Sequence, residues 1–145
     1  TAPTSTVISL GSADASNRAG VNRFEAYHSV EGFSKVGAYY GNGNADGSFI
    51  HTGFRPAFLL TKRTGAASWW CMWDSTRSTY NVNDTMIGAH DSAAEVGGGA
   101  GGDTMAIDFL SNGIKMREND SYANNAEGYF YVAFAETPFK NANAR

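Results

Sequence analysis

Residues 128–136 read GYFYVAFAE, and they carry the strongest strand signal in the chain. Aromatic and β-branched side chains dominate this run, and both types favour the pleated, half-buried surface of a sheet. A second run, SWWCMWD at residues 68–74, has large apolar side chains at both alternating sets of positions. Such a strand is expected to be covered on both sides, or to be covered on one side and used for binding on the other.

Outward from these two runs, short apolar segments between turn signals predict further strands. They lie at residues 5–10, 24–30, 35–40, 49–52, 57–63, 104–110 and 114–117. Asn112-Gly113, between the last two, is a strong two-residue hairpin signal. The single helix candidate, around residues 92–96, is too short to matter. About eight to ten short strands without a substantial helix predict an all-β fold, an antiparallel β-sandwich or jelly roll.

Composition and charge exclude several classes of function. The chain has 145 residues, the size of one domain, with 42% hydrophobic residues and a net charge of −3. Its 11 lysines and arginines form no basic stripe that could neutralise phosphates, so no nucleic-acid partner is expected. No apolar run approaches the length of a membrane span, so no membrane insertion is expected. The single cysteine, Cys71, permits no intrachain disulfide and is interpreted as a small buried hydrophobic residue.

The sequence shows no constellation for a metal, a cofactor or catalysis. His28, His51 and His90 are far apart and have no metal-ligand spacing. The run NGNADG at residues 42–47 resembles the start of a calcium loop, but Gly53 stands where the glutamate ligand is required, so we interpret it as a turn. No nucleophile elbow is present, and no pair of carboxylates stands out. We therefore predict no metal, no cofactor, no catalytic residue and no enzymatic activity.

A binding site is indicated by the tryptophan-rich run. Strand alternation puts Trp69, Cys71 and Trp73 on one face, which we expect to be core. Trp70 and Asp74 share the other face, and Arg77 and Tyr80 follow closely. Aromatic faces can stack on the C–H surface of a sugar while carboxylate and guanidinium groups bind its hydroxyls. The predicted ligand-binding set is therefore Trp70, Asp74, Arg77 and Tyr80. The alternative is that all three tryptophans pack inside the domain or against a neighbouring subunit.

Several short runs stand in a fixed order between residues 37 and 145. They are YGNG at 40–43, GFRPAF at 53–58, TKR at 61–63, WDSTR at 73–77, DFLSNGIK at 108–115 and YVAFAETPFK at 131–140. Together they resemble a module found near the C-termini of tailed-bacteriophage structural proteins. The resemblance implies a β-sandwich of the concanavalin-A-like or SPRY-like type, carried on tail fibres or other virion appendages. It brings no catalytic residues and no agreed ligand site. Residues 1–23 match poorly and are expected to be an N-terminal arm or the end of a preceding module, with residues 24–145 as a single β-sandwich domain.

Three functions remain open on these grounds. The first is a virion structural domain of a tail fibre or appendage that binds host surface glycan, located on the tail or capsid surface. Its partners would be other virion proteins and further copies of itself, with a trimer favoured because weak single sites gain avidity by multivalency. The second is a capsid-decoration or fibre-assembly subunit with no ligand. The third is a carbohydrate-binding accessory module of a polysaccharide-degrading enzyme.

Overall fold

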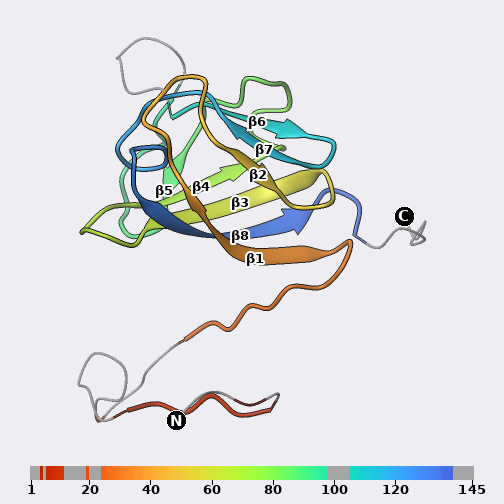
Figure 1. Ribbon diagram of the computed structural model, residues 1–145, viewed down its shortest axis with the longest axis vertical. Coiled ribbons are helices and arrows are strands. Elements are labelled where there is room, and N and C mark those ends of the chain that lie inside the picture. The colour runs from red at the N-terminus through yellow and green to blue at the C-terminus, as the bar shows by residue number, and fades with distance from the viewer. Residues whose placement is uncertain (1–3, 5, 12–18, 20–23, 98–104, 139–145) are drawn as a thin grey trace.

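The computed structural model describes residues 4, 6–11, 19, 24–97 and 105–138, and within them the chain forms two packed antiparallel sheets without a helix. Figure 1 shows the three-stranded sheet above the five-stranded one. The larger sheet has the order β1 (Ser34–Tyr40), β8 (Gly128–Ala135), β3 (Pro56–Arg63), β4 (Trp70–Asp74), β5 (Ile87–Gly88). The smaller has the order β2 (Phe49–His51), β7 (Gly113–Met116), β6 (Ile107–Leu110). This arrangement confirms the predicted all-β sandwich.

The core lies between the sheets and follows the period of two expected for strands. Leu59, Trp73 and Tyr131 point inward from the larger sheet and meet Phe109 and Ile114 of the smaller sheet in one buried cluster. Trp73 is fully buried, and its indole Nε1 donates a hydrogen bond of 2.8 Å to the carbonyl oxygen of Met105. Cys71 is also fully buried, so the face of the tryptophan-rich strand predicted to be core is confirmed.

The predicted strand at residues 24–30 was wrong. Only Val30 forms a bridge, with Ser34, across the turn that leads into β1. The Ser29 hydroxyl instead bonds the backbone of Val36, accepting from its N–H at 3.0 Å and donating to its carbonyl oxygen at 3.3 Å. A side chain therefore occupies the backbone groups of β1 that a neighbouring strand would need.

Three further expectations differ from the structure. Residues 6–10 of the predicted first strand belong to no strand, and residue 5 lies outside the described residues. Residues 92–96 form no helix. The strand predicted at 104–110 is shorter and begins at Ile107, while residue 104 lies outside the described part of the chain. The structure adds β5, whose two residues are too few to produce a periodic sequence signal.

Candidate functional site

The outer face of the larger sheet is unusually apolar. Strand register places its outward side chains in three rows that cross β8, β3 and β4. The rows are Phe130–Lys62–Trp70, Val132–Leu60–Met72 and Phe134–Phe58–Asp74. Seven of these nine side chains are hydrophobic, so this sheet presents apolar surface to both of its sides. Trp70 is exposed, Val132 is buried and the other five are partly buried. Apolar surface that remains accessible on such a face marks a place for a ligand or a partner.

The outer face of the smaller sheet is different in character. Asp108 on β6 lies opposite Lys115 on β7 and is held by Arg117 through a 2.5 Å hydrogen bond between Arg117 Nε and Asp108 Oδ2. The Lys115 ammonium lies 2.7 Å from a carboxylate oxygen of Asp46. The outer side of this sheet therefore carries charged pairs, and the Asp108 carboxylate among them is itself buried. The contrast between the two sheets directs attention to the apolar one.

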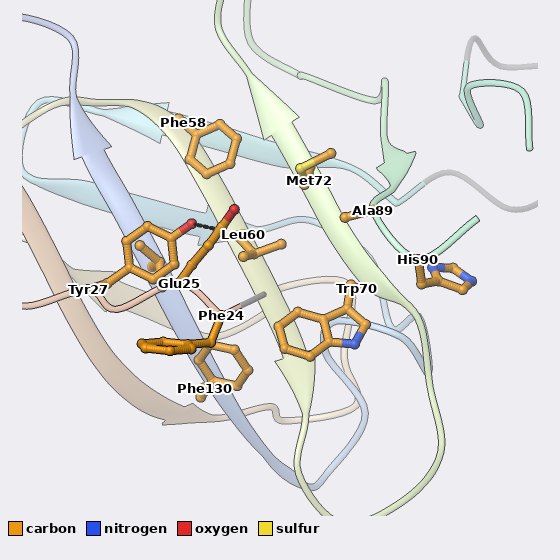
Figure 2. Close-up of a pocket in the computed structure, with 11 residues that line it drawn as sticks. Phe24, Glu25, Tyr27, Phe58, Leu60, Trp70, Met72, Ala89, His90 and Phe130 are labelled. Carbon is orange, nitrogen blue, oxygen red and sulfur yellow. Dashed lines mark hydrogen bonds between the residues drawn. The ribbon is translucent and has the colours of Figure 1, made fainter. Parts of the chain in front are cut away.

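The segment from Phe24 to Tyr27, which we call the strap, lies over part of the apolar face. The Tyr27 ring meets Phe134 edge to face, with ring centroids 6.1 Å apart. Phe24 and Glu25 of the strap line a hollow of about 700 Å³ together with side chains of β3, β4 and β8. Figure 2 shows Phe24, Phe130 and Trp70 toward one end of this hollow and Phe58 and Met72 toward the other. Binding sites for small molecules commonly have volumes of roughly 300–1,000 Å³.

Aromatic edges and a few polar groups shape the hollow. The Trp70 ring meets Phe130 edge to face, with centroids 5.4 Å apart, and Trp70 keeps 39% of its surface exposed. On the strap, the Tyr27 hydroxyl donates a hydrogen bond to Glu25, and this bond raises the pKa of Tyr27. His90 lines the opposite side, and its Nε2 lies 3.2 Å from Asp91 Oδ2. The hollow thus combines apolar walls with a carboxylate and an imidazole.

The four residues of the predicted ligand-binding set do not gather in this hollow. Trp70 lines it, whereas Asp74, Arg77 and Tyr80 are not among its lining residues. Asp74 does share the outer face with Trp70, but it lies four residue steps along the strand from it, a distance of about 13 Å. Tyr80 is 84% exposed.

Asp74 and Arg77 are engaged in the turn that follows β4. Asp74 Oδ1 accepts hydrogen bonds of 2.9 Å from the backbone N–H groups of Thr76 and Arg77. Burial alone would raise the pKa of Asp74, but these bonds and the Arg77 guanidinium outweigh it and hold the pKa below its usual value. Arg77 also donates to Glu95 Oε2 at 2.9 Å. Both side chains therefore have structural partners that a ligand would have to replace.

Sequence reasoning missed Phe24, Glu25, His90 and Phe130 as lining residues. Phe130 could have been found, because alternation in residues 128–136 puts it on the face opposite Tyr129 and Tyr131, which are both buried. The position of the strap over the sheet could not have been predicted, because it depends on the turn at Val30–Ser34 and on the hydroxyl of Ser29. His90 follows β5, which has no sequence signal of its own.

Other candidate chemistry is accounted for by local structure. Asn42 Oδ1 accepts from the N–H of Asn44, and Asn44 Oδ1 accepts from the N–H of Asp46, so the calcium-like run is tied into successive turns. In the part of the chain that the structure describes, no three His, Cys, Asp or Glu side chains gather as metal ligands would. Burial raises the pKa of the Cys71 thiol to about 12. None of the described segments forms a helix of the length and hydropathy needed to cross a membrane.

Comparison with known proteins gives a family but no characterised relative. No curated protein and no solved structure shows significant similarity to the chain. One family does match, and its match extends over residues 1–138, which is nearly the whole length. The chain therefore belongs to the family described as Domain of unknown function (DUF7483).

Proposed function

We propose that this chain is a structural domain of a tailed-bacteriophage virion, carried on a tail fibre or another appendage, and that it binds host-cell-surface glycan. The ordered motifs between residues 40 and 140 support the virion assignment through their resemblance to phage structural modules. The hollow on the outer face of the larger sheet is the observation that supports glycan binding. We place the site there, at Trp70, and not across the wider set of Asp74, Arg77 and Tyr80.

The walls of the hollow suit a sugar ring. Trp70, Phe130 and Phe24 offer aromatic surface on which the C–H face of a pyranose can pack. Glu25 Oε2 accepts from Tyr27 and His90 Nε2 lies beside Asp91, which leaves Glu25 Oε1 to accept hydrogen bonds from sugar hydroxyl groups and His90 Nδ1 to donate or accept them according to its tautomer. A single site of this size binds a sugar weakly, and several copies on one appendage convert weak binding into avidity. The proposed role is recognition without chemical conversion, in an oligomer for which a trimer is favoured.

The test is a screen of the purified chain on an array of bacterial surface glycans, with Trp70→Ala and Tyr80→Ala run in parallel. Saturable binding to a narrow set of glycans, lost in Trp70→Ala and kept in Tyr80→Ala, is the expected result. Loss in Tyr80→Ala with retention in Trp70→Ala would move the site away from the hollow. Phe49→Ala is a suitable control, because Phe49 is an exposed aromatic residue on the smaller sheet. Absence of binding by a folded chain would refute glycan recognition.

A second candidate, an assembly subunit without a ligand, is favoured by one observation. Apolar side chains occupy all three rows of the outer face, and the strap that packs on Phe134 adds the exposed rings of Phe24 and Tyr27 to this apolar surface. In that case the face would be covered by another copy or by another virion protein. Light scattering measures the mass of the oligomer, and Met72→Glu would place a charge in the middle row. Dissociation by Met72→Glu, in a chain that binds no glycan, would select this function.

A further inference from the structure

The floor of the hollow is aliphatic and not aromatic. Leu60, Met72 and Val132 form the middle row of the outer face, and all three line the hollow. Val132 is buried although it lies on the outer face. A hydroxyl group placed on this row would lose its water without gaining a hydrogen-bond partner there, which is unfavourable. A methyl group on the same row would instead remove apolar surface from water.

The charges around the hollow disfavour an acidic ligand. Among the described residues that line it, Glu25 is the carboxylate and none is lysine or arginine. Lys62 lies in the row between Phe130 and Trp70, but its ammonium donates to the carbonyl oxygens of Arg63 at 2.8 Å and Ala66 at 3.4 Å. It is therefore directed toward the connection between β3 and β4. A carboxylate or phosphate on the ligand would face Glu25 without a cation to neutralise it.

These two observations identify a class of ligand. Building on the proposed function, we infer that the hollow selects an uncharged sugar residue carrying a methyl-bearing substituent, a 6-deoxy or an N-acetyl group. The methyl group rests on Leu60, Met72 and Val132, while the ring packs against Trp70 and Phe130. Its hydroxyl or amide groups remain at the rim with Glu25 and His90. Both substituents offer the same methyl chemistry to the floor, and matched sugars distinguish them.

The experiment compares pairs of methyl glycosides that differ at one group. L-Rhamnose and L-mannose differ by the hydroxyl at carbon 6, and N-acetylglucosamine and glucose differ by the acetamido group. Binding is titrated by chemical-shift changes of the protein, and saturation-transfer NMR identifies which protons of the sugar lie against the protein. We expect at least one methyl-bearing sugar to bind tenfold or more tightly than its partner, which is the usual effect of one such group in an apolar pocket. Its methyl protons should receive the strongest saturation.

Two variants and an acidic probe complete the design. Met72→Gln keeps the side-chain length but puts an amide on the floor, so it should reduce the preference for the methyl-bearing sugar while binding at Trp70 persists. Methyl glucuronide should bind worse than glucose to the wild type and should gain affinity in Glu25→Gln. Equal affinity within every pair, or preference for glucuronide, would overturn this inference and leave glycan binding intact. No saturable binding by any sugar, on the array or in the titrations, would overturn the proposed function and the inference together.

Discussion

The assignment of the two faces of β4 can be tested by making the same change at two tryptophans three residues apart. Trp73→Phe alters a fully buried side chain whose Nε1 donates to the Met105 carbonyl oxygen at 2.8 Å. The smaller ring leaves a gap in the core, and the buried carbonyl loses its donor. An unsatisfied buried acceptor costs about 1–3 kcal/mol. A loss of buried volume of this size adds roughly 1–2 kcal/mol, so the free energy of unfolding should fall by about 2–5 kcal/mol.

Trp70→Phe makes the same chemical change on the outer face. Trp70 is 39% exposed, and a phenyl ring there can keep the edge-to-face contact with Phe130. The cost should stay below about 1 kcal/mol, as for most substitutions at half-exposed positions. Total stabilities of domains are about 5–15 kcal/mol, so the difference between the two variants is a large fraction of the whole.

Urea titration followed by far-UV circular dichroism measures the free energy of unfolding of each variant. The values can be compared as long as the slope of the free energy against urea concentration is unchanged. The free energy of unfolding should depend on urea concentration with the same slope in the wild type and in both variants. The urea concentration at the unfolding midpoint should fall strongly only for Trp73→Phe. Equal costs at the two positions, or a larger cost at Trp70, would show that the faces of β4 are assigned wrongly. Trp70 would then be a core residue, and the hollow would have lost its principal wall.

Three further predictions concern other parts of the chain. Asn124→Ala should lower the free energy of unfolding by about 2–4 kcal/mol in the same titration, because this buried amide bonds backbone and side-chain groups of the loop at residues 42–48 and the backbone of Glu118. Gly41→Ala should cost more than about 2 kcal/mol, since its Cβ would lie 2.1 Å from the backbone oxygen of Asn125, whereas Gly11→Ala has nothing within 4 Å and should be neutral. The Cys71 thiol should not react with a disulfide reagent at pH 8 until the chain is unfolded. Burial raises the pKa of the Cys71 thiol in the folded state from 9.0 to about 12. The stabilisation that comes from burying the neutral thiol is therefore intact below pH 9 and is lost as the pH rises toward 12. Rapid labelling of the folded protein at pH 8 would contradict the burial of this thiol.

The fold could be predicted from sequence where side-chain alternation is strong. In residues 68–74, alternation correctly put Cys71 and Trp73 inside and Trp70 outside, because successive strand residues point to opposite faces. In residues 128–136, the aromatic and β-branched composition predicted a strand. That strand is β8, which pairs with both β1 and β3. Local pattern was sufficient in these cases because the strands lie within the interior of a sheet.

Prediction failed where the outcome depends on contacts distant in sequence or on single side chains. Residues 24–30 have strand-like composition, but the hydroxyl of Ser29 takes up the backbone groups of Val36, and no ladder forms beyond Val30. A related cause separates the residues of the predicted ligand-binding set in the structure. Proximity in sequence grouped Asp74 and Arg77 with Trp70, whereas Asp74 is the acceptor that organises the turn after β4. An aspartate that ends a strand commonly serves such a turn, and composition alone does not separate this role from binding.

The strap bears directly on the choice between a glycan ligand and a subunit interface. A stable interface between subunits needs a broad surface with good complementarity, whereas a sugar needs a hollow of limited size. Phe24 and Tyr27 lie over the apolar face yet remain 63% and 44% exposed, so they interrupt this face without sealing it. A second subunit would have to pack on the strap or displace it from Phe134, while a sugar can enter between the strap and Trp70 with both in place. The position of the strap on Phe134, in the row that also contains Phe58, therefore favours a small ligand within the hollow.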